Sequence, residues 1–214
     1  MNSVPQDELS PIHILLLDWW RTNRRDFPWR RDGTTPYQML VAEMLLWRTR
    51  AESVFSIWDD FFTVYPSIES LAEAQVDEIH TLIAPLGLRK RAEYLKLMAQ
   101  RILGDYAGVV PDDRDALMNI LGVGEYVASA VLTFMFREDV AVYDANVRRI
   151  MYRMFDTEDD VVAREHADSL VPPGIGPEWN YALLDLGAIL CRWRPECATC
   201  PLRSLCEMGR LKVR

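Results

Sequence analysis

The sequence predicts an all-α fold, and three observations support that prediction. Alternation of apolar and polar residues never extends beyond about five positions, so strands are few or absent. Apolar residues instead recur at helical spacing, as at Val76, Ile79 and Ile83. The chain has 214 residues, 50% of them hydrophobic, which is enough for a substantial core in one large domain or two small ones.

Several helix starts are marked by capping side chains. Ser10-Pro11 and Thr35-Pro36 each place a capping hydroxyl before a proline at the first helical position. Gly87 is suited to end a helix, because glycine adopts the left-handed conformation of a C-cap. The predicted helices span residues 12–20, 37–48, 68–74, 76–84, 89–106, 115–121, 125–136, 145–155, 161–171 and 178–191.

Charge alone argues weakly against a nucleic-acid partner, because the net charge is −8. The basic residues are nearly all arginines, however, and they are clustered, which leaves room for a local basic face on an acidic protein. The clusters are Arg21/Arg24/Arg25/Arg30/Arg31, Arg48/Arg50, Arg89/Lys90/Arg91 and Arg148/Arg149/Arg153. We expect no secretory signal in the polar N-terminal segment, and no apolar run in the sequence is long enough to span a membrane.

Four cysteines lie close together near the C-terminus, in the pattern Cys191-x5-Cys197-x2-Cys200-x5-Cys206. In a chain without an export signal, this clustering indicates a metal site and not a disulfide framework. Zinc sites pair two short knuckles, whereas only Cys197 and Cys200 form one here. The wide flanking gaps therefore favour an iron–sulfur cluster, with zinc or no metal as the alternatives.

Gly122-Val123-Gly124 lies between two predicted helices. Two glycines permit a tight reversal and leave backbone N–H groups exposed at the start of the next helix. Such groups bind a phosphate without reading the DNA sequence, as in a helix–hairpin–helix. A plain helix connector is the alternative interpretation.

Four further residues carry candidate chemistry. Asp144 precedes the helix over 145–155 as its N-cap, where the helix terminus favours an ionised carboxylate that could stabilise a developing sugar cation. Glu43 interrupts an apolar run, so it lies either on an exposed stripe or buried with a partner. Trp47 and Arg48 are predicted to end their helix as an aromatic wedge and a base contact, unless Trp47 belongs to the core.

Together and in this order, these features resemble the helix–hairpin–helix base-excision DNA glycosylases with a C-terminal iron–sulfur cluster, the group that contains endonuclease III and the adenine glycosylases. The resemblance extends from Leu15 to Cys206. Besides the cysteines it is carried by Leu17-Asp18-Trp19-Trp20, Phe27-Pro28-Trp29-Arg30, Pro36-Tyr37, Gly122-Val123-Gly124, Asp144-Ala145-Asn146-Val147 and Leu184-Asp185-Leu186-Gly187-Ala188. The opening segment is most similar to the archaeal thymine–guanine mismatch glycosylases.

The resemblance implies two helical lobes. A six-helix barrel with the helix–hairpin–helix is expected over residues 28–136. A second lobe, formed by 1–27 and 137–214, is expected to carry one 4Fe-4S cluster. The implied partner is double-stranded DNA with a mismatched or damaged base, bound in the groove between the lobes. The implied state is a monomer, away from membranes, in the cytoplasm at the nucleoid.

The resemblance also assigns roles to individual residues. The expected catalytic residues are Asp144, Tyr126 and Glu43. The expected DNA-binding residues are Gly122, Gly124, Trp47 and Arg48. The expected metal ligands are Cys191, Cys197, Cys200 and Cys206. Three features depart from the family pattern: Leu121 replaces a proline, the first cysteine gap is one residue shorter, and Trp47-Arg48 stands where glutamine is frequent.

The residue two positions after Gly124 distinguishes subclasses of this family. Members that also cut the DNA backbone carry a lysine there, because an amine must form the Schiff base. Here the residue is Tyr126. We therefore expect a monofunctional glycosylase that removes T or U opposite G. The alternatives are an adenine glycosylase without its oxidised-guanine reader domain, a bifunctional lyase, and a non-catalytic DNA-binding protein with a structural zinc.

Overall fold

The computed structural model describes residues 9–87 and 89–211, and the all-α prediction is confirmed, with helices and no strand among these residues. The chain divides into two compact units. The central unit is Asp26–Phe136, and the terminal unit combines the described residues up to Arg25 with those from Arg137 onward. The first eight residues, to which the signal-peptide argument applies, lie outside the described part of the chain. None of the described helices is long and apolar enough to cross a membrane.

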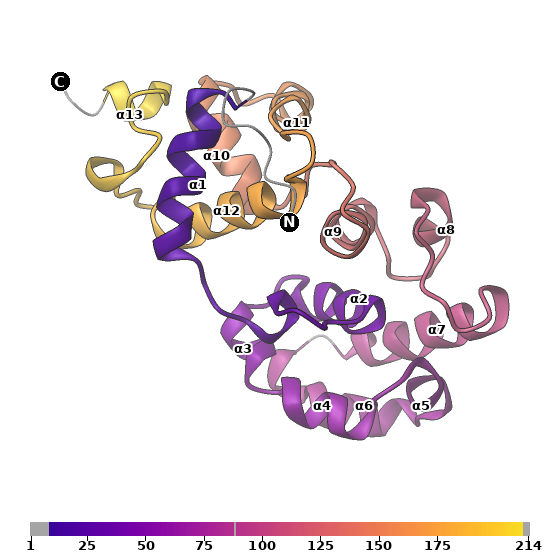
Figure 1. Ribbon diagram of the computed structural model, residues 1–214. Helices are drawn as coiled ribbons and strands as arrows, with labels where there is room; N and C mark the ends of the chain where they lie inside the picture. The colour runs from indigo at the N-terminus through magenta and orange to yellow at the C-terminus, as the bar shows by residue number, and fades with distance from the viewer. Residues whose placement is uncertain (1–8, 88, 212–214) are drawn as a thin grey trace. The chain divides into compact units, whose positions relative to one another are not determined.

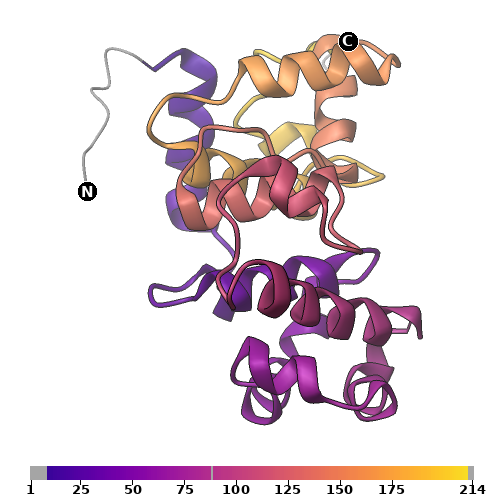
Figure 2. The same cartoon turned by 90° about the vertical axis from the view of Figure 1, so that its right-hand side faces the viewer.

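The central unit consists of short helices joined by tight turns (Figures 1 and 2). Its α-helices are α2 (Pro36–Leu46), α3 (Ala51–Phe55), α4 (Trp58–Val64), α5 (Ile68–Glu73), α6 (Val76–Ile83), α7 (Lys90–Asp105), α8 (Arg114–Met118) and α9 (Glu125–Phe136), with 3-10 turns at Pro28–Arg30 and Ala84–Leu86.

Helix α2 forms much of the core of the central unit. It begins as predicted, because Thr35 Oγ1 accepts a hydrogen bond from the Gln38 N–H at 3.2 Å and Gln38 Oε1 accepts one from the Thr35 N–H at 3.0 Å. Its buried residues occur on all sides, as expected of a helix enclosed by neighbours. The helix ends at Leu46, however, two residues before the predicted end, so Trp47 lies on the turn that follows.

Helices α3, α4 and α13 (Glu207–Leu211) were not predicted. Each has only five to seven residues, which is too few to establish a helical period. The residues that precede α3 and α4, Arg50 and Ile57, make no side-chain capping bond, so these helices also lack a start signal.

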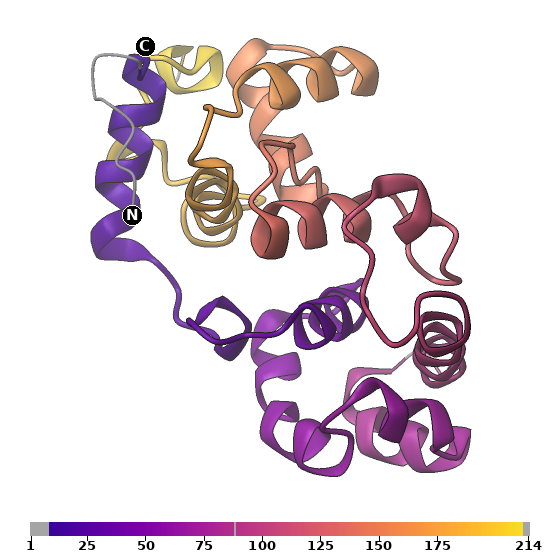
Figure 3. The ribbon, with the colours of Figure 1, turned by 45° about the vertical axis from the view of Figure 1, so that its right-hand side comes forward.

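The terminal unit is built around α10 and α12. Figure 3 shows α1 alongside α12, and α10 contacts α11, α12 and α13. Its helices are α1 (Pro11–Asn23), α10 (Ala145–Phe155), α11 (Asp160–Ser169), α12 (Gly176–Ile189) and α13, with a 3-10 turn at Cys197–Thr199.

A buried carboxylate fixes the point where the chain leaves α1. Asp185, on α12, is fully buried and accepts hydrogen bonds from Trp20 Nε1 at 2.9 Å and from the Arg25 main-chain N–H at 3.1 Å. Arg25 Nε also pairs with Asp185 Oδ1 at 2.6 Å. A buried charge needs such partners to offset its desolvation. Arg25, predicted as part of a basic cluster, is therefore engaged inside the terminal unit.

Candidate active site and cysteine pocket

Asp144 is the N-cap of α10, as predicted. Its Oδ1 accepts hydrogen bonds from the N–H groups of Asn146 and Val147, at 2.8 and 2.7 Å. Its Oδ2 accepts one from Asn146 Nδ2 at 2.8 Å. Three donors thus fix the plane of the carboxylate, and of its roughly four lone-pair sites the remaining one lies on Oδ2.

Burial raises the pKa of Asp144 above its ordinary value, and this is the largest influence on the group. The hydrogen bonds from Val147 and Asn146 and the charge of Arg149 act in the opposite direction. The sequence argument considered only the helix terminus, which favours the ionised form, and could not include desolvation. A carboxylate that is partly destabilised in the free protein gains more from a nearby cation than a solvated one does.

Arg149 connects this cap to the end of α12. Its Nη2 donates to Asn146 Oδ1 at 2.8 Å and to the Gly187 carbonyl at 2.9 Å, while its Nε donates to the Cys191 carbonyl at 2.7 Å. The helices approach closely here, because a Cβ on Gly187 would lie 2.6 Å from Asn146 Cβ. Sequence reasoning missed both roles, although Gly187 lies within a motif that carried the resemblance.

Arg153, one turn after Arg149, also points inward. It donates to the carbonyl oxygens of Arg192 and Trp193 and to Cys191 Sγ, the last at 3.3 Å. The cluster Arg148/Arg149/Arg153 was expected on a basic surface, but only Arg148 is exposed. The other two satisfy main-chain carbonyls that the end of α12 and the following loop leave unpaired.

Glu43 and Tyr126 form a pair inside the central unit. Glu43, on α2, is 2% exposed, and Tyr126 lies in the first turn of α9. The Tyr126 hydroxyl donates a hydrogen bond to Glu43 Oε2 at 2.7 Å. Of the two interpretations that the sequence left open, burial with a partner therefore applies to Glu43. The pair combines a buried carboxyl group with a phenol at the start of a helix.

The turn between α8 and α9 has a different requirement at each glycine. Gly122 has a φ of +87°, a conformation that favours glycine, and a Cβ there would lie 3.0 Å from Met44 Cε. Both the backbone conformation and this close contact therefore oppose a side chain at position 122. Val123 is buried and anchors the turn. At Gly124 a Cβ would meet nothing within 4 Å, which leaves the main chain open to close approach from outside.

Trp47 and Arg48 occupy the exposed turn after α2. Trp47 is 50% exposed, so the alternative of a core tryptophan is wrong. Arg48 has a φ of +55°, which is unusual for any residue other than glycine. Its guanidinium lies 6.0 Å from the Trp47 ring centroid. Both side chains are thus presented together at the surface of the central unit.

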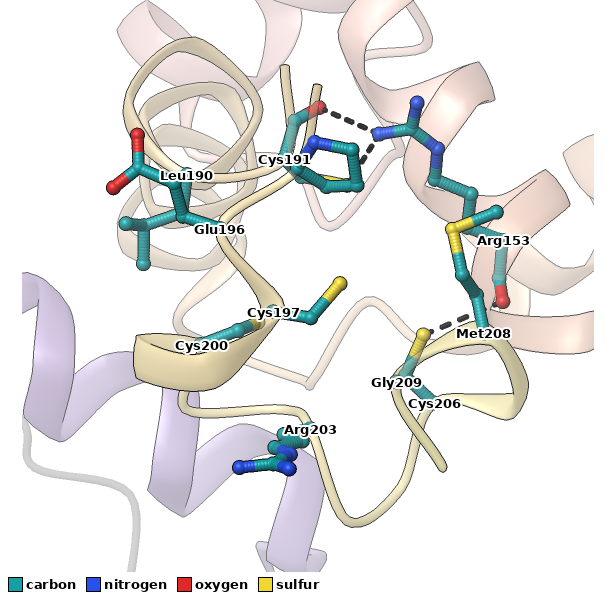
Figure 4. A pocket seen from close by; sticks show the side chains of 11 residues that line it. Arg153, Leu190, Cys191, Glu196, Cys197, Cys200, Arg203, Cys206, Met208 and Gly209 are labelled. Carbon is teal, nitrogen blue, oxygen red and sulfur yellow. Dashed lines mark hydrogen bonds between the residues drawn. The ribbon is translucent and has the colours of Figure 1, made fainter. Parts of the chain in front are cut away.

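The four cysteines line one pocket (Figure 4). One side of the pocket is the loop that follows α12, and the other side is α13. The walls also include Arg153, Leu190, Pro195, Glu196, Arg203, Met208 and Gly209. All four cysteines are free thiols. Within the described ranges, no three His, Cys, Asp or Glu side chains form a group that could hold a metal ion. The Cys206 thiol instead donates to the Arg153 carbonyl at 3.3 Å.

The predicted residues therefore fall into separate groups. Glu43, Tyr126 and the hairpin glycines belong to the central unit, whereas Asp144 and the cysteines belong to the terminal unit. Within the terminal unit, Arg149 links Asp144 to the cysteine pocket through Cys191. The approach of Asp144 to Tyr126 across a groove stays a prediction.

Comparison with known proteins places this arrangement in a family. Residues 41–173 match the model of the HhH-GPD superfamily of base excision DNA repair proteins. The chain is 38% identical to a thymine/uracil-DNA glycosylase of Methanothermobacter thermautotrophicus, over 90% of each chain. It is 40% identical to an adenine DNA glycosylase of Mycobacterium tuberculosis, over 90% of this chain and 67% of that one.

A solved thermostable thymine-DNA glycosylase has the same fold. It superimposes with a TM-score of 0.87 at 36% identity, covering 94% of this chain and 95% of that one. The family match spans more than half of the sequence and includes the second half of α2, the hairpin and Asp144. The chain therefore belongs to the HhH-GPD superfamily of base excision DNA repair proteins.

Proposed function

We propose that this base excision DNA repair protein is a monofunctional DNA glycosylase that hydrolyses the N-glycosidic bond of T or U opposite G. The observation that carries the proposal is the hydrogen bond from Tyr126 to the buried Glu43. Tyr126 stands two residues after Gly124, where the resemblance puts the lysine of backbone-cutting members, and a phenol cannot form a Schiff base. A thymine/uracil-DNA glycosylase among the relatives supports the choice of base.

In the proposed reaction the target base is extruded from the duplex and the bond between C1′ and its nitrogen breaks. The electron pair leaves with the base, and Glu43 donates a proton or hydrogen bond to it. Tyr126 orients Glu43 and packs against the flipped nucleoside. Extrusion costs least at a mispair, which supplies part of the selectivity for T opposite G.

Asp144 acts on the sugar. As the bond breaks, positive charge develops at C1′, and an ionised carboxylate held in a fixed orientation stabilises that charge. Water then adds to C1′, and its proton passes to Asp144 or to solvent. The three hydrogen bonds that Asp144 accepts fix its position before the substrate arrives, so little reorganisation is needed.

We propose one 4Fe-4S cluster as the cofactor, held by Cys191, Cys197, Cys200 and Cys206. The four free thiols are not grouped closely enough to hold a single metal ion, but they line one pocket, which suits the larger body of a cluster, and Arg153 donates a hydrogen bond toward Cys191 Sγ. When bound, the cluster would crosslink the C-terminal loop and stabilise the terminal unit. Zinc is the competing occupant, and metal analysis distinguishes the two.

The competing function is adenine excision, favoured by the 40% identity to the mycobacterial adenine DNA glycosylase. Single-turnover assays on duplexes with T·G, U·G, A·G and A opposite oxidised guanine separate the two functions. We expect excision of T and U opposite G, leaving an abasic site with an intact backbone. Excision confined to A would overturn the choice of base, and no excision at all would favour a non-catalytic DNA-binding protein.

The proposed partner is double-stranded DNA that contains the mispair, bound by a monomer at the nucleoid in the cytoplasm. The Gly124 main chain and the exposed Arg48 are the candidate contacts. Sedimentation of the protein with a mismatched duplex should give one chain per duplex. A second chain on a short duplex would contradict the monomer.

A further inference from the structure

A buried cation lies behind the turn that carries Trp47 and Arg48. Arg91, in the first turn of α7, is 2% exposed, and no carboxylate pairs with it among the described residues. Its Nη2 donates to the Trp47 carbonyl at 2.5 Å, and its Nη1 donates to Thr49 Oγ1 at 3.0 Å. Its Nε is buried and has no hydrogen-bond acceptor.

The position of this charge shows what compensates it. Helix α2 ends at Leu46, so its last carbonyls carry the partial negative charge of a helix C-terminus. Arg91 sits at that end and binds the first carbonyl beyond it. Burial lowers the pKa of Arg91, yet a guanidinium remains protonated at neutral pH. The cost of desolvating a buried cation is large, and a helix end and a turn offset only part of it, so Arg91 is a poor means of stabilising the fold.

The turn itself adopts a conformation that needs support. The backbone of Arg48 has the left-handed conformation, with a φ of +55°. Arg48 lies between the two residues that Arg91 binds, Trp47 and Thr49. The Thr49 N–H closes the turn onto the Leu46 carbonyl at 3.0 Å. Strained main-chain conformations persist where the surrounding contacts determine them, and they concentrate at functional positions. Here the strain projects two exposed side chains from one short segment.

We propose that Arg91 is a positioning residue for base extrusion, holding the Trp47–Arg48 turn in the conformation that enters the duplex. This inference rests on the proposed glycosylase function. The two hydrogen bonds that Arg91 donates, here called the clamp, act on the main chain at Trp47 and on the side chain of Thr49. The clamp therefore fixes the residues on both sides of Arg48 and does not involve the side chains of Trp47 and Arg48. Trp47 then fills the space that the flipped base leaves, and Arg48 contacts the opposite base.

The first experiment tests the clamp in the free protein. The chain is labelled with 5-fluorotryptophan, and the Trp47 resonance is assigned with Trp47→Phe. We expect Arg91→Met to broaden or shift that resonance while the others stay in place. The matched control is Arg101→Met, which removes an exposed arginine of the same helix. An unchanged Trp47 resonance would overturn the proposal whatever the protein does to DNA.

Stability separates positioning from a structural role. Methionine has a similar volume and carries no charge that must be desolvated, and apolar replacements of buried charges are often neutral or stabilising, so Arg91→Met should unfold at the wild-type temperature or above it. Arg91→Lys keeps the charge but not the two-pronged geometry, and serves if the methionine variant does not fold. A large loss of stability in both variants would show that Arg91 has a structural role and would overturn the proposal.

The second experiment measures the consequence on DNA. Single-turnover excision is compared for U opposite G and for U opposite an abasic-site analogue, where flipping is easier and no opposite base remains to be contacted. We expect Arg91→Met to slow the first reaction by at least about tenfold and the second by less than about threefold. Equal slowing on both substrates would contradict positioning. Absence of excision by the wild type would count against the glycosylase function and leave the fluorine result standing.

Discussion

Gly187 on α12 packs directly against Asn146 on α10: a Cβ on Gly187 would lie 2.6 Å from Asn146 Cβ. Asn146 is also the residue that donates from both its main chain and its side chain to Asp144. The separation of two helices therefore determines where the candidate catalytic carboxylate stands.

Gly187→Ala should consequently impair both stability and catalysis. The added methyl group forces the helices apart, at a cost of about 1–3 kcal/mol. For a chain of this size we expect Tm to fall by roughly 2–12 °C. Excision should slow by about tenfold or more, because the cap moves with Asn146.

Gly104→Ala is the matched control for that variant. It adds the same methyl group to α7, where a Cβ would meet nothing within 4 Å. Its Tm should stay the same or rise slightly, since alanine favours a helix more than glycine does. Wild-type activity in Gly187→Ala would show that the cap tolerates displacement.

Asp144→Asn should abolish chemistry while preserving the fold. Asparagine is as good an N-cap as aspartate, so α10 should form normally. Without the negative charge, excision should slow by at least about two orders of magnitude, roughly 2.7 kcal/mol of transition-state stabilisation. Binding to a mismatched duplex should persist. Near-normal excision in single-turnover assays would refute the assigned role.

The same substitution has a pH signature. Because the folded protein raises the pKa of Asp144 above its ordinary value of 3.8, the folded state holds this proton more tightly than the unfolded state does. The contribution of Asp144 to stability is therefore lost as pH rises from 3.8 through the folded pKa, and Asp144→Asn lacks this contribution. Stability of the variant relative to wild type should rise with pH across that interval, as measured by denaturant unfolding at several pH values.

Gly124→Ala should weaken binding to matched and mismatched duplexes alike. The methyl group meets nothing within the protein, but it stands where a phosphate would approach the main chain. We expect about tenfold weaker binding, near 1.4 kcal/mol, with unchanged Tm. Gly122→Ala should instead lower Tm, because its φ and the contact with Met44 both oppose a side chain. A loss confined to mismatched DNA would assign lesion recognition to the hairpin.

Tyr126→Lys tests whether this side chain faces the sugar. An amine at that position can attack C1′ and form a Schiff base, which leads to strand cleavage and a borohydride-trappable adduct. Tyr126→Phe should give neither, and should only slow excision by removing the hydrogen bond to Glu43. Trapping with the wild-type protein would instead identify a bifunctional lyase.

The purified protein should be brown and contain about four irons per chain, with thiolate-to-iron absorbance near about 400 nm. Cys197→Ser should lose the colour and destabilise the terminal unit more than the central one, because cofactor binding is coupled to folding. Hydrogen exchange resolved by segment would show the difference. Stoichiometric zinc in a colourless protein would overturn the proposed cluster.

Helices that begin with a capping side chain could be predicted from the sequence. Thr35 and Asp144 mark the starts of α2 and α10, and both caps are present. The end of α2 was placed too late, because a left-handed Arg48 has no signature in the sequence. Arg91 binds the residues on both sides of Arg48, but it is distant along the chain, so this contact could not be inferred from the residues around the turn.

Pairings between distant residues were beyond the sequence. Tyr126 and Glu43 are 83 positions apart, and only the packing of α9 on α2 brings them together. Arg149 was grouped with Arg148 and Arg153 as a basic cluster because the three arginines are close in sequence, although Arg149 binds carbonyls at the end of α12. Arg91 did leave a signal, since it occupies the apolar face of α7 with Leu95 and would have been expected to be buried.

The division of the chain dictates an order of events during synthesis. The central unit is one continuous segment, whereas the terminal unit needs α1 from the beginning of the chain and α12 from near its end. At bacterial or eukaryotic elongation rates, α1 leaves the ribosome roughly 10–30 s before its partner helix. During that interval its apolar face, with Ile12 and Leu16, has no α12 to cover it. Helix α1 is therefore accessible to chaperones and proteases until α12 has been made, whereas the central unit can already have folded by then.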